Sequence, residues 1–449
     1  MSDKSTSSSV TTNACKLCAP LGATVAFKGI EGAMPMIHGG QGCATYIRRY
    51  LISHYNEPLD VASSSFSDEA AIFGGESNIR TGMDNVTKKY SPAMIGVSTT
   101  CLAETIGDDM NAIMKRYILA KDEPIGPVVI PVSTPSYSGT HMEGFHIAVR
   151  GVVERLAIDP TPRNGINILP GFVSTADIRY LKEVLTSFDL EYTLLPDYSD
   201  TLDGPAQCDY HAVPRGGTPI AAIAAMAGRR ATVEFGRTLP PNTTAGAGLA
   251  ARHDVPLCSL GMPIGIGETD LFFEAIAELS GKPVSDLHTA ERGRLIDAYV
   301  DGHKYIFGKR VVVYGEEDLV VGLTSFLSEI GAIPVLCASG GTSGRLAQAV
   351  RIVAPNHTPM TREGADFGEI EELAAKLAPD FVVGNSKGYG LSRRLKIPLV
   401  RVGFPIHDRI GGQRVLHLGY RGAQRLFDEI VNSLIAKSQD DSPIGYSYM

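Results

Sequence analysis

Short apolar runs separated by longer amphipathic stretches recur along most of the chain. The first run, AMIGVST at 93–99, is followed by helical apolar spacing over 102–117 and by a second run, GPVVIPVST, at 126–134. Short buried strands that alternate with helices are typical of parallel α/β layers. The pattern therefore predicts a strand, a helix and a strand in the first third of the chain.

The same alternation returns twice. From residue 164, GINILP, LEYTLLP, ATVEF and DVPLCSL predict strands, with helices at 174–188 and 271–281. A third series opens with a compact strand–helix–strand unit at 309–340, continues through IPLVRVGFP and ends in a helix at 422–437. The charged stretch before it predicts a helical connection. We therefore expect an α/β protein with three Rossmann-like parallel-sheet domains, at 18–163, 164–308 and 309–449, after a flexible leader at 1–17.

Composition and charge narrow the functional classes. Of 449 residues 44% are hydrophobic, which is enough for several packed cores, and the net charge is −8. Acidic balance without long basic clusters argues against nucleic-acid and anionic-membrane partners. No stretch approaches the ~20 apolar residues of a membrane span, and the polar N-terminus lacks the apolar core of a secretory signal. Seven cysteines, an odd number, then suggest a reducing compartment, and we expect a cytoplasmic protein.

A nucleotide site is not expected in this chain. The phosphate-binding pattern GxxxxGK[ST] occurs nowhere, and the glycine-rich SGGTSG at 339–344 lacks the lysine that would hold a phosphate. We interpret SGGTSG as a structural turn between a strand and a helix.

Three cysteines in the first quarter of the chain lie in unusual loops. They are Cys18 in CKLCAPLGA, Cys43 in HGGQGC and Cys101 in STTCLAETIGDD. Cys101 falls where a predicted strand ends and a helix begins, and the N–H groups of a helix N-terminus favour thiolate over thiol. Thiolates are the ligands of soft metal centres.

The spacing excludes the small zinc modules but leaves two interpretations open. The pair Cys15 and Cys18 has no second CxxC at zinc-ribbon distance, and no strand precedes it as in a thioredoxin-like motif. Single cysteines on distant loops suit an iron–sulfur cluster, although three inert, buried thiols would give the same spacing. The remaining positions are interpreted as structural thiols and as a hydrogen-bonding turn histidine: Cys208, Cys258, Cys337 and His38.

Longer motifs carry a family resemblance. CAPLGA, MPMIHGGQGCATYIRRY, SSSFSDEAAIFGG, VSTTCLAETIGDDMNAI and TPSYSGTHMEGF occur in this order, followed by SKGYGLS and IPLVRVGFPIHDR. Together they resemble the β (K-type) subunits of nitrogenase component 1 and its nitrogenase-like relatives, from Cys18 to Gly422. The resemblance implies three α/β domains, a homologous α (D-type) partner in an α2β2 heterotetramer, and a separate ATP-hydrolysing iron protein as electron donor.

The resemblance also implies a cofactor and its ligands. An [8Fe-7S] P-cluster would bridge the αβ interface, held on this side by Cys18, Cys43 and Cys101. Ser136 in the TPS motif would join them when the cluster is oxidised, and the glycines of HGGQGC would let the backbone approach the cluster. The catalytic iron–sulfur cofactor of such enzymes lies in the α partner. This chain is therefore expected to contain no catalytic residue and to relay electrons.

Two aromatic residues match positions on the electron path of the family. Phe73 corresponds to an exposed phenylalanine where the iron protein docks, and Tyr46 to a residue close to the cluster. From its pattern alone, SDEAAIFGG favours a helix whose last apolar residue, Phe73, packs into the core.

Several family members are compatible with these motifs. CKLCAPLGATVAFKGIEGAMP and the short leader resemble most the K subunit of methylthio-alkane reductase, which liberates sulfur from small thioethers. The alternatives are a nitrogenase β subunit, whose molybdenum form usually has a longer N-terminal extension, and an N-type cofactor-assembly scaffold, which often has fewer cluster cysteines. Protochlorophyllide and chlorophyllide reductase subunits match less well. An idle interaction subunit would require inert cysteines. The partner chain determines the substrate and any heterometal.

Overall fold

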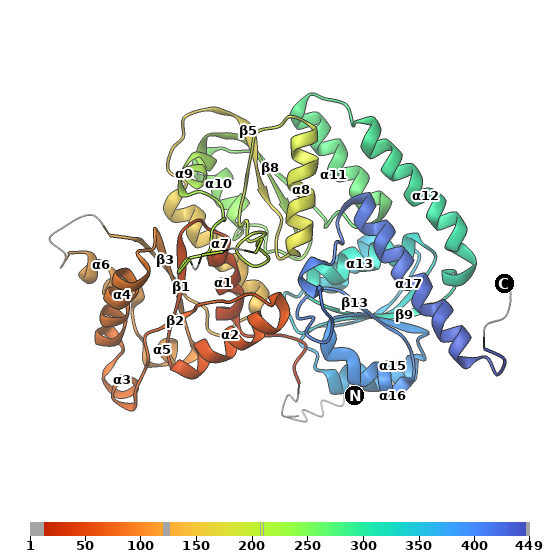
Figure 1. Cartoon of the computed structure of the whole chain (residues 1–449), viewed down its shortest axis with the longest axis horizontal. Helices are drawn as coiled ribbons and strands as arrows, with labels where there is room; N and C mark the ends of the chain where they lie inside the picture. The colour runs from red at the N-terminus through yellow and green to blue at the C-terminus, as the bar shows by residue number, and fades with distance from the viewer. Residues whose placement is uncertain (1–12, 120–125, 207, 210, 446–449) are drawn as a thin grey trace, which may run out of the picture.

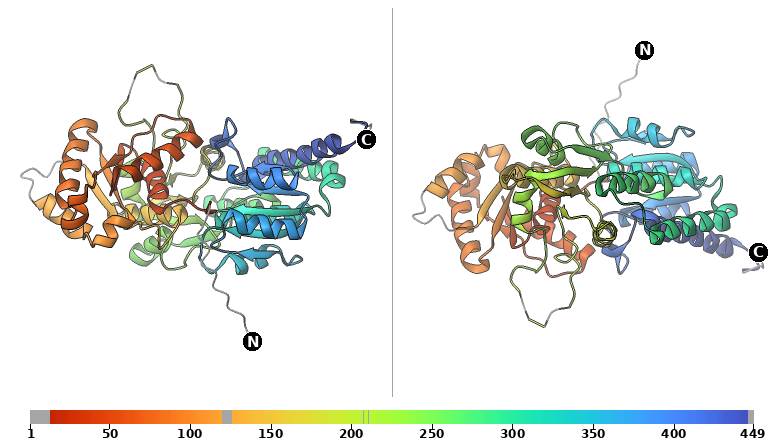
Figure 2. Two further views of the ribbon diagram at one scale, coloured as in Figure 1. Left: turned by 90° about the horizontal axis from the view of Figure 1, so that it is seen from below. Right: turned by 90° about the horizontal axis from the view of Figure 1, so that it is seen from above.

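Three lobes, each built around a four- or five-stranded parallel sheet, make up the structure, a computed structural model that describes residues 13–119, 126–206, 208–209 and 211–445 (Figure 1). The strand orders are β2-β1-β3-β4, β6-β5-β7-β8 and β11-β10-β9-β12-β13. The first and third lobes lie at opposite ends of the molecule (Figure 2). The predicted α/β class with three parallel sheets is confirmed.

The first lobe carries the three early cysteines. Its elements are α1 (Ala19–Lys28), β1 (Ala33–His38), α2 (Gln41–Tyr55), β2 (Ala62–Ser63), α3 (Asp68–Phe73), α4 (Glu76–Tyr90), β3 (Met94–Thr99), α5 (Cys101–Ile106), α6 (Met110–Leu119), β4 (Val128–Val132) and α7 (His141–Leu156). Strands β1 and β3 are buried at every position, because α4 and α6 pack on one face of the sheet and α1 on the other.

The prediction of a single helix at 102–117 is wrong in one respect. The structure has two helices there, α5 and α6, because Gly107 adopts a left-handed φ of +80° that ends α5. Asp109 then accepts a hydrogen bond from Ala112 N at 3.0 Å and starts α6.

The second lobe follows the predicted order of strands and helices. Its elements are β5 (Arg163–Leu169), α8 (Thr175–Ser187), β6 (Tyr192–Leu194), α9 (Ile220–Ala224), η1 (Ala225–Gly228), β7 (Arg229–Phe235), α10 (Ala245–His253), β8 (Leu257–Leu260), α11 (Gly265–Ser280) and α12 (Asp286–Ile306). Helix α12 is the connection expected before residue 309, and Gly281 ends α11 with a left-handed φ of +69°.

The third lobe is closed by the C-terminal helix. Its elements are β9 (Arg310–Gly315), α13 (Glu317–Glu329), β10 (Ile333–Ser339), α14 (Leu346–Val353), β11 (Met360–Arg362), α15 (Phe367–Leu377), β12 (Phe381–Gly384), η2 (Ser386–Gly388), α16 (Tyr389–Leu395), β13 (Leu399–Arg401), η3 (Gly412–Arg414) and α17 (Gly419–Asp441). Helix α17 packs back against α12 (Figure 1). SGGTSG is the predicted turn between β10 and α14.

The N-terminal segment contacts the third lobe, although it precedes the first. Residues 1–12 of the expected leader lie outside the described residues. From there on, Cys15 N donates to Ala365 O at 3.2 Å, and Lys387 Nζ donates to Ala14 O at 2.8 Å. The segment that leads to Cys18 is therefore held by hydrogen bonds to the third lobe.

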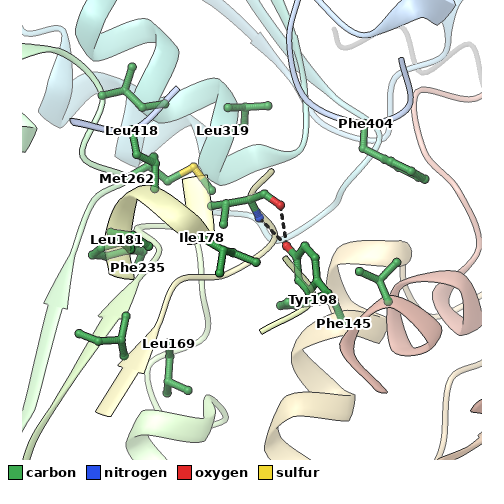
Figure 3. Close-up of a cluster of buried hydrophobic side chains, with 14 of the residues drawn as sticks. Phe145, Leu169, Ile178, Leu181, Tyr198, Phe235, Met262, Leu319, Phe404 and Leu418 are labelled. Atoms are coloured by element: carbon green, nitrogen blue, oxygen red, sulfur yellow. Dashed lines mark hydrogen bonds between the residues drawn. The ribbon is translucent and has the colours of Figure 1, made fainter. Parts of the chain in front are cut away.

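One apolar core runs through the meeting point of the lobes. Figure 3 shows side chains that converge there from α7, the second sheet and the third lobe, among them Phe145, Phe235 and Leu319. Tyr198 OH lies in this core and donates to Val173 O at 2.6 Å. A core shared in this way fixes the three lobes relative to one another.

Candidate functional site

Each of the three early cysteines lies at the N-terminus of a helix of the first lobe. Cys18 is the N-cap residue of α1, Cys43 is the third residue of α2, and Cys101 is the first residue of α5. The neighbouring parallel strands β1 and β3 lead into α2 and α5 respectively. Parallel neighbours end at the same edge of a sheet, so this topology delivers Cys43 and Cys101 to one place.

The thiols lie close enough to influence one another. Burial raises the pKa of the Cys18 thiol to about 11, and the nearby sulfurs of Cys43 and Cys101 add to the rise. The pKa of Cys43 is also raised, first by burial and then by Cys101. Three separate loops thus bring their sulfurs into one neighbourhood.

Ser136 belongs to the same group. Its backbone N donates to the sulfur of Cys101 at 3.1 Å, and its hydroxyl accepts from Ala19 N, at the start of α1, at 3.2 Å. The four residues predicted as cluster ligands are therefore adjacent, although they are spread over more than a hundred positions of the sequence.

This donor set fits an iron–sulfur cluster better than a single metal ion. Within the described ranges, no three His, Cys, Asp or Glu side chains surround one metal-ion position. Neighbouring sulfurs that do not surround a single metal-ion position are typical of an iron–sulfur cluster, in which separate thiolates bind different irons. Positively charged iron would also replace the protons that burial and mutual repulsion hold on these thiols.

The glycines of HGGQGC have different roles. A Cβ added to Gly39 would lie 2.3 Å from Thr100 Oγ1, so the chain itself requires a glycine there. A Cβ on Gly40 or Gly42 would meet no atom within 4 Å, and Gly40 has an ordinary φ of −70°. The fold does not require these two glycines. They leave open space directly beside Cys43, which is itself exposed.

Large apolar side chains surround this open face. Tyr46 is 62% exposed, and Leu102 and Tyr137, which directly follow Cys101 and Ser136, are exposed as well. Exposed apolar groups that cluster beside a candidate site mark surfaces that another molecule covers.

A buried histidine connects this site to α3. His38, at the end of β1, lies 3.1 Å through Nε2 from Asp108 Oδ2 and 3.1 Å through Nδ1 from Ser64 Oγ. Both ring nitrogens therefore have partners, which confirms a hydrogen-bonding histidine, but His38 is the last residue of strand β1 and does not lie in the predicted turn. Because a carboxylate only accepts, Nε2 carries the proton, and burial lowers the pKa of the ring. Asp108 also accepts from Gly75 N at 3.0 Å, directly after α3.

Helix α3 presents Phe73 to solvent. The side chain is 81% exposed and its neighbour Ile72 is 74% exposed. The interpretation of Phe73 as a core residue, drawn from its pattern alone, is therefore wrong: only Ala70 of this six-residue helix is buried.

The other cysteines lie away from the site. Cys258 and Cys337 are in strands β8 and β10, as predicted. Cys15 is buried in the third lobe's core, where burial raises its pKa to about 12. Cys208, which we interpreted as a structural thiol, is exposed on a loop and is therefore not part of a buried core. None of the seven cysteines forms a disulfide.

Sequence reasoning missed two acidic residues near the cysteines. Asp108 links β1 to the end of α3, and Glu104 accepts from Ser133 Oγ at 2.6 Å, which connects α5 to the segment before Ser136. Both follow Cys101 in the motif CLAETIGDD, but the sequence shows only that they are acidic. Their partners are the last residue of β1, the N-cap residue of α4 and the residue that follows β4, and no local pattern identifies them.

In the described part of the chain, no helix combines the length and apolar character needed to span a bilayer.

Comparison with known proteins agrees with this geometry. The family model for nitrogenase component 1 type oxidoreductases matches residues 18–435. The molybdenum–iron protein β chain of Clostridium pasteurianum is 37% identical over 95% of this chain and 93% of its own length. That of Azotobacter vinelandii is 35% identical, over 96% and 86%.

Solved structures agree as well. A chain of the structure titled "Nitrogenase Cp1 at pH 6.5" superposes with a TM-score of 0.94 at 34% identity, over 100% of this chain and 98% of that one. A chain of "Nitrogenase Cp1 at pH 5" shares the fold alone, with a TM-score of 0.72 at 15% identity. The protein belongs to the nitrogenase component 1 family of oxidoreductases, as a chain of the β type.

Proposed function

We propose that this chain is the β subunit of a nitrogenase-type reductase and holds half of an [8Fe-7S] P-cluster. Cys18, Cys43 and Cys101 would bind the cluster, and Ser136 would join them in its oxidised state. The observation that carries this proposal is the convergence of these four residues at an exposed edge of the first lobe. When bound, the cluster supplies a one-electron carrier between an external donor and the partner subunit.

The chain's own residues define what surrounds the cluster. Cys18, Cys43 and Cys101 lie at helix N-termini, where the helix dipole favours negative charge, and Gly40 and Gly42 leave room beside Cys43. Tyr46 lies one helical turn after Cys43 and would stand on the electron's path. The exposed aromatic surface leaves this half-site open to a partner that supplies the remaining ligands.

The partner would be a homologous α (D-type) subunit in an α2β2 assembly. That subunit would hold the catalytic iron–sulfur cofactor, so this chain would supply no catalytic residue. An ATP-hydrolysing iron protein would dock at α3, where Phe73 is the most exposed aromatic side chain beside the site. We place the complex in the cytoplasm, where its free thiols would stay reduced.

The comparisons favour dinitrogen as the substrate of the complex. The two relatives described above are nitrogenase β chains that match nearly the whole of this chain. This supports nitrogenase over methylthio-alkane reductase, which the sequence motifs had favoured. The complete ligand set also supports a reductase over an N-type assembly scaffold.

The test is to purify the chain with the D-type subunit encoded beside it and to assay it with its iron protein and ATP. Ammonia formed from dinitrogen would support nitrogenase. A thiol and a hydrocarbon formed from a small thioether would instead establish methylthio-alkane reductase. Iron transfer to a cofactor-deficient component 1, without turnover of either substrate, would identify a scaffold. A purified complex without iron would contradict all three.

A further inference from the structure

A cavity of about 580 Å³ lies where the three lobes meet, and Cys18, Cys43 and Cys101 do not line it. It is bounded by α7 and by the loops that follow β7, β9 and β10. Ligands of parallel α/β proteins bind at the carboxyl ends of the strands, and this volume is in the range of small-molecule sites. The proposed electron relay does not use this space.

The cavity carries an excess of negative charge. Glu143, Glu317 and Asp318 line it, and none of them has a cationic partner among the described residues. Among the described residues, Asp318 accepts only from the backbone N–H groups of Arg237 and Thr238, at 2.7 and 2.8 Å. Of the lysine and arginine side chains in the lining, Arg150 is already paired with Glu154 at 2.7 Å, which leaves Lys16 against the three carboxylates.

Burial of these carboxylates close together disfavours their ionised form. Burial, and then the charges of Glu363 and Glu143, raise the pKa of Glu317. A bound cation would offset both effects, because an opposite charge within a few ångströms favours the ionised carboxylate.

An anion does not fit this cavity, despite its glycine-rich loop. In SGGTSG, the N–H of Ser343 donates to Glu317 at 3.2 Å, and the N–H of Gly344 donates to Glu363 at 2.8 Å. A Cβ added to Gly341 would lie 2.6 Å from Glu317 Oε1. Carboxylates of the chain thus occupy the donors that a phosphate would need. A metal ion is also disfavoured, because the described residues contain no suitable ligand group.

The rest of the lining suits an organic molecule. Val132, Met142, Ile147 and Leu239 provide apolar walls. His146 also faces the cavity, and neither of its ring nitrogens has a hydrogen-bond partner among the described residues. Burial lowers the pKa of His146, so the ring is neutral and offers an acceptor to a ligand N–H.

We propose that this cavity binds a small organic cation, with a protonated amine or guanidinium group against Glu143, Glu317 and Asp318 and a short apolar body against α7. The site is independent of the cluster. It would exist in a complex that had lost its iron, and its failure would leave the proposed electron relay intact.

Charge selectivity is the direct test. Benzylammonium, benzyl alcohol and benzoate have similar shapes and differ in charge, and their binding to the purified protein, in the assembly it forms in the cell, can be followed by isothermal titration calorimetry. We expect benzylammonium to bind more tightly than benzyl alcohol by at least about tenfold, and benzoate not to bind.

Three variants locate the binding. Glu317→Gln keeps an acceptor for Ser343 N but removes the charge, and should weaken benzylammonium binding by about tenfold or more. Glu363→Gln is the matched control, because Glu363 contacts the same loop but does not line the cavity, and it should weaken benzylammonium binding much less than Glu317→Gln does. Ile147→Trp, at a side chain that is 40% exposed, should block the cavity without disturbing the core.

Equal binding of all three probes, or cation binding that survives both Glu317→Gln and Ile147→Trp, would overturn the proposal. So would the absence of benzylammonium binding to a correctly folded wild-type protein.

Discussion

Replacing Asp108 with alanine should loosen the connection between α3 and the cysteine loops. The carboxylate accepts from Gly75 N at 3.0 Å and from His38 Nε2 at 3.1 Å, and its side chain is only 9% exposed. Without it, two donors are left in a site that water reaches poorly, at a cost of about 1–2 kcal/mol each. We therefore expect local opening of residues 64–80 to become easier by roughly 2–4 kcal/mol.

Hydrogen–deuterium exchange with mass spectrometry measures this opening directly. The change corresponds to exchange that is roughly 30- to 700-fold faster in peptides from 64–80. Asp109→Ala removes the same charge from the adjacent position, but that carboxylate accepts from Ala112 N of α6. It should speed exchange in α6 and leave 64–80 unchanged. Wild-type exchange of 64–80 in Asp108→Ala would refute the role of this hydrogen-bond network.

Three further predictions follow from burial and charge. Phe73→Ala should leave the midpoint of thermal unfolding unchanged, because the ring is 81% exposed, but should lower turnover at limiting iron protein by roughly tenfold or more. A fall in thermal stability with unchanged turnover would instead indicate that Phe73 packs in the core. Cys15→Ser places a hydroxyl in a core and should destabilise the protein by about 1–3 kcal/mol without changing its iron content; iron loss would make Cys15 a ligand. Burial lowers the pKa of His54 to about 4, below its ordinary 6.5, so the unfolded state binds the proton more tightly and the free energy of unfolding should fall by up to roughly 3 kcal/mol as pH drops from 6.5 to 4. His54→Gln should make the urea-unfolding midpoint less dependent on pH in this range, and an unchanged pH dependence would exclude His54 as the cause.

The sequence was a good guide to the regular layers of the fold. Runs rich in β-branched residues, such as VVVYG and ATVEF, are typical of buried parallel strands, and both are strands here. The division of 102–117 into two helices was not visible, since one glycine within an amphipathic stretch is compatible with a continuous helix. The contact of the N-terminal segment with the third lobe also depends on tertiary partners, Ala365 and Lys387, that no local pattern reveals.

The candidate site was predicted in part from chemistry and in part from resemblance. Spacing alone left Cys18, Cys43 and Cys101 compatible with either a cluster or inert thiols, and only the fold shows that their loops meet. At Phe73 the local pattern gave the wrong prediction. Its position at the end of an apolar stretch favoured burial, but α3 has six residues and contacts the core through Ala70 alone.

Iron content together with electron paramagnetic resonance of the purified complex tests most directly whether Cys18, Cys43 and Cys101 hold an iron–sulfur cluster. Cys43→Ala should lose the cluster signal and the corresponding iron, and should weaken association with the partner subunit, because the cluster would lose one of its anchors. Cys258→Ala, in strand β8, should affect only packing and keep both signals. Full iron content and an unchanged spectrum in Cys43→Ala would contradict the assignment.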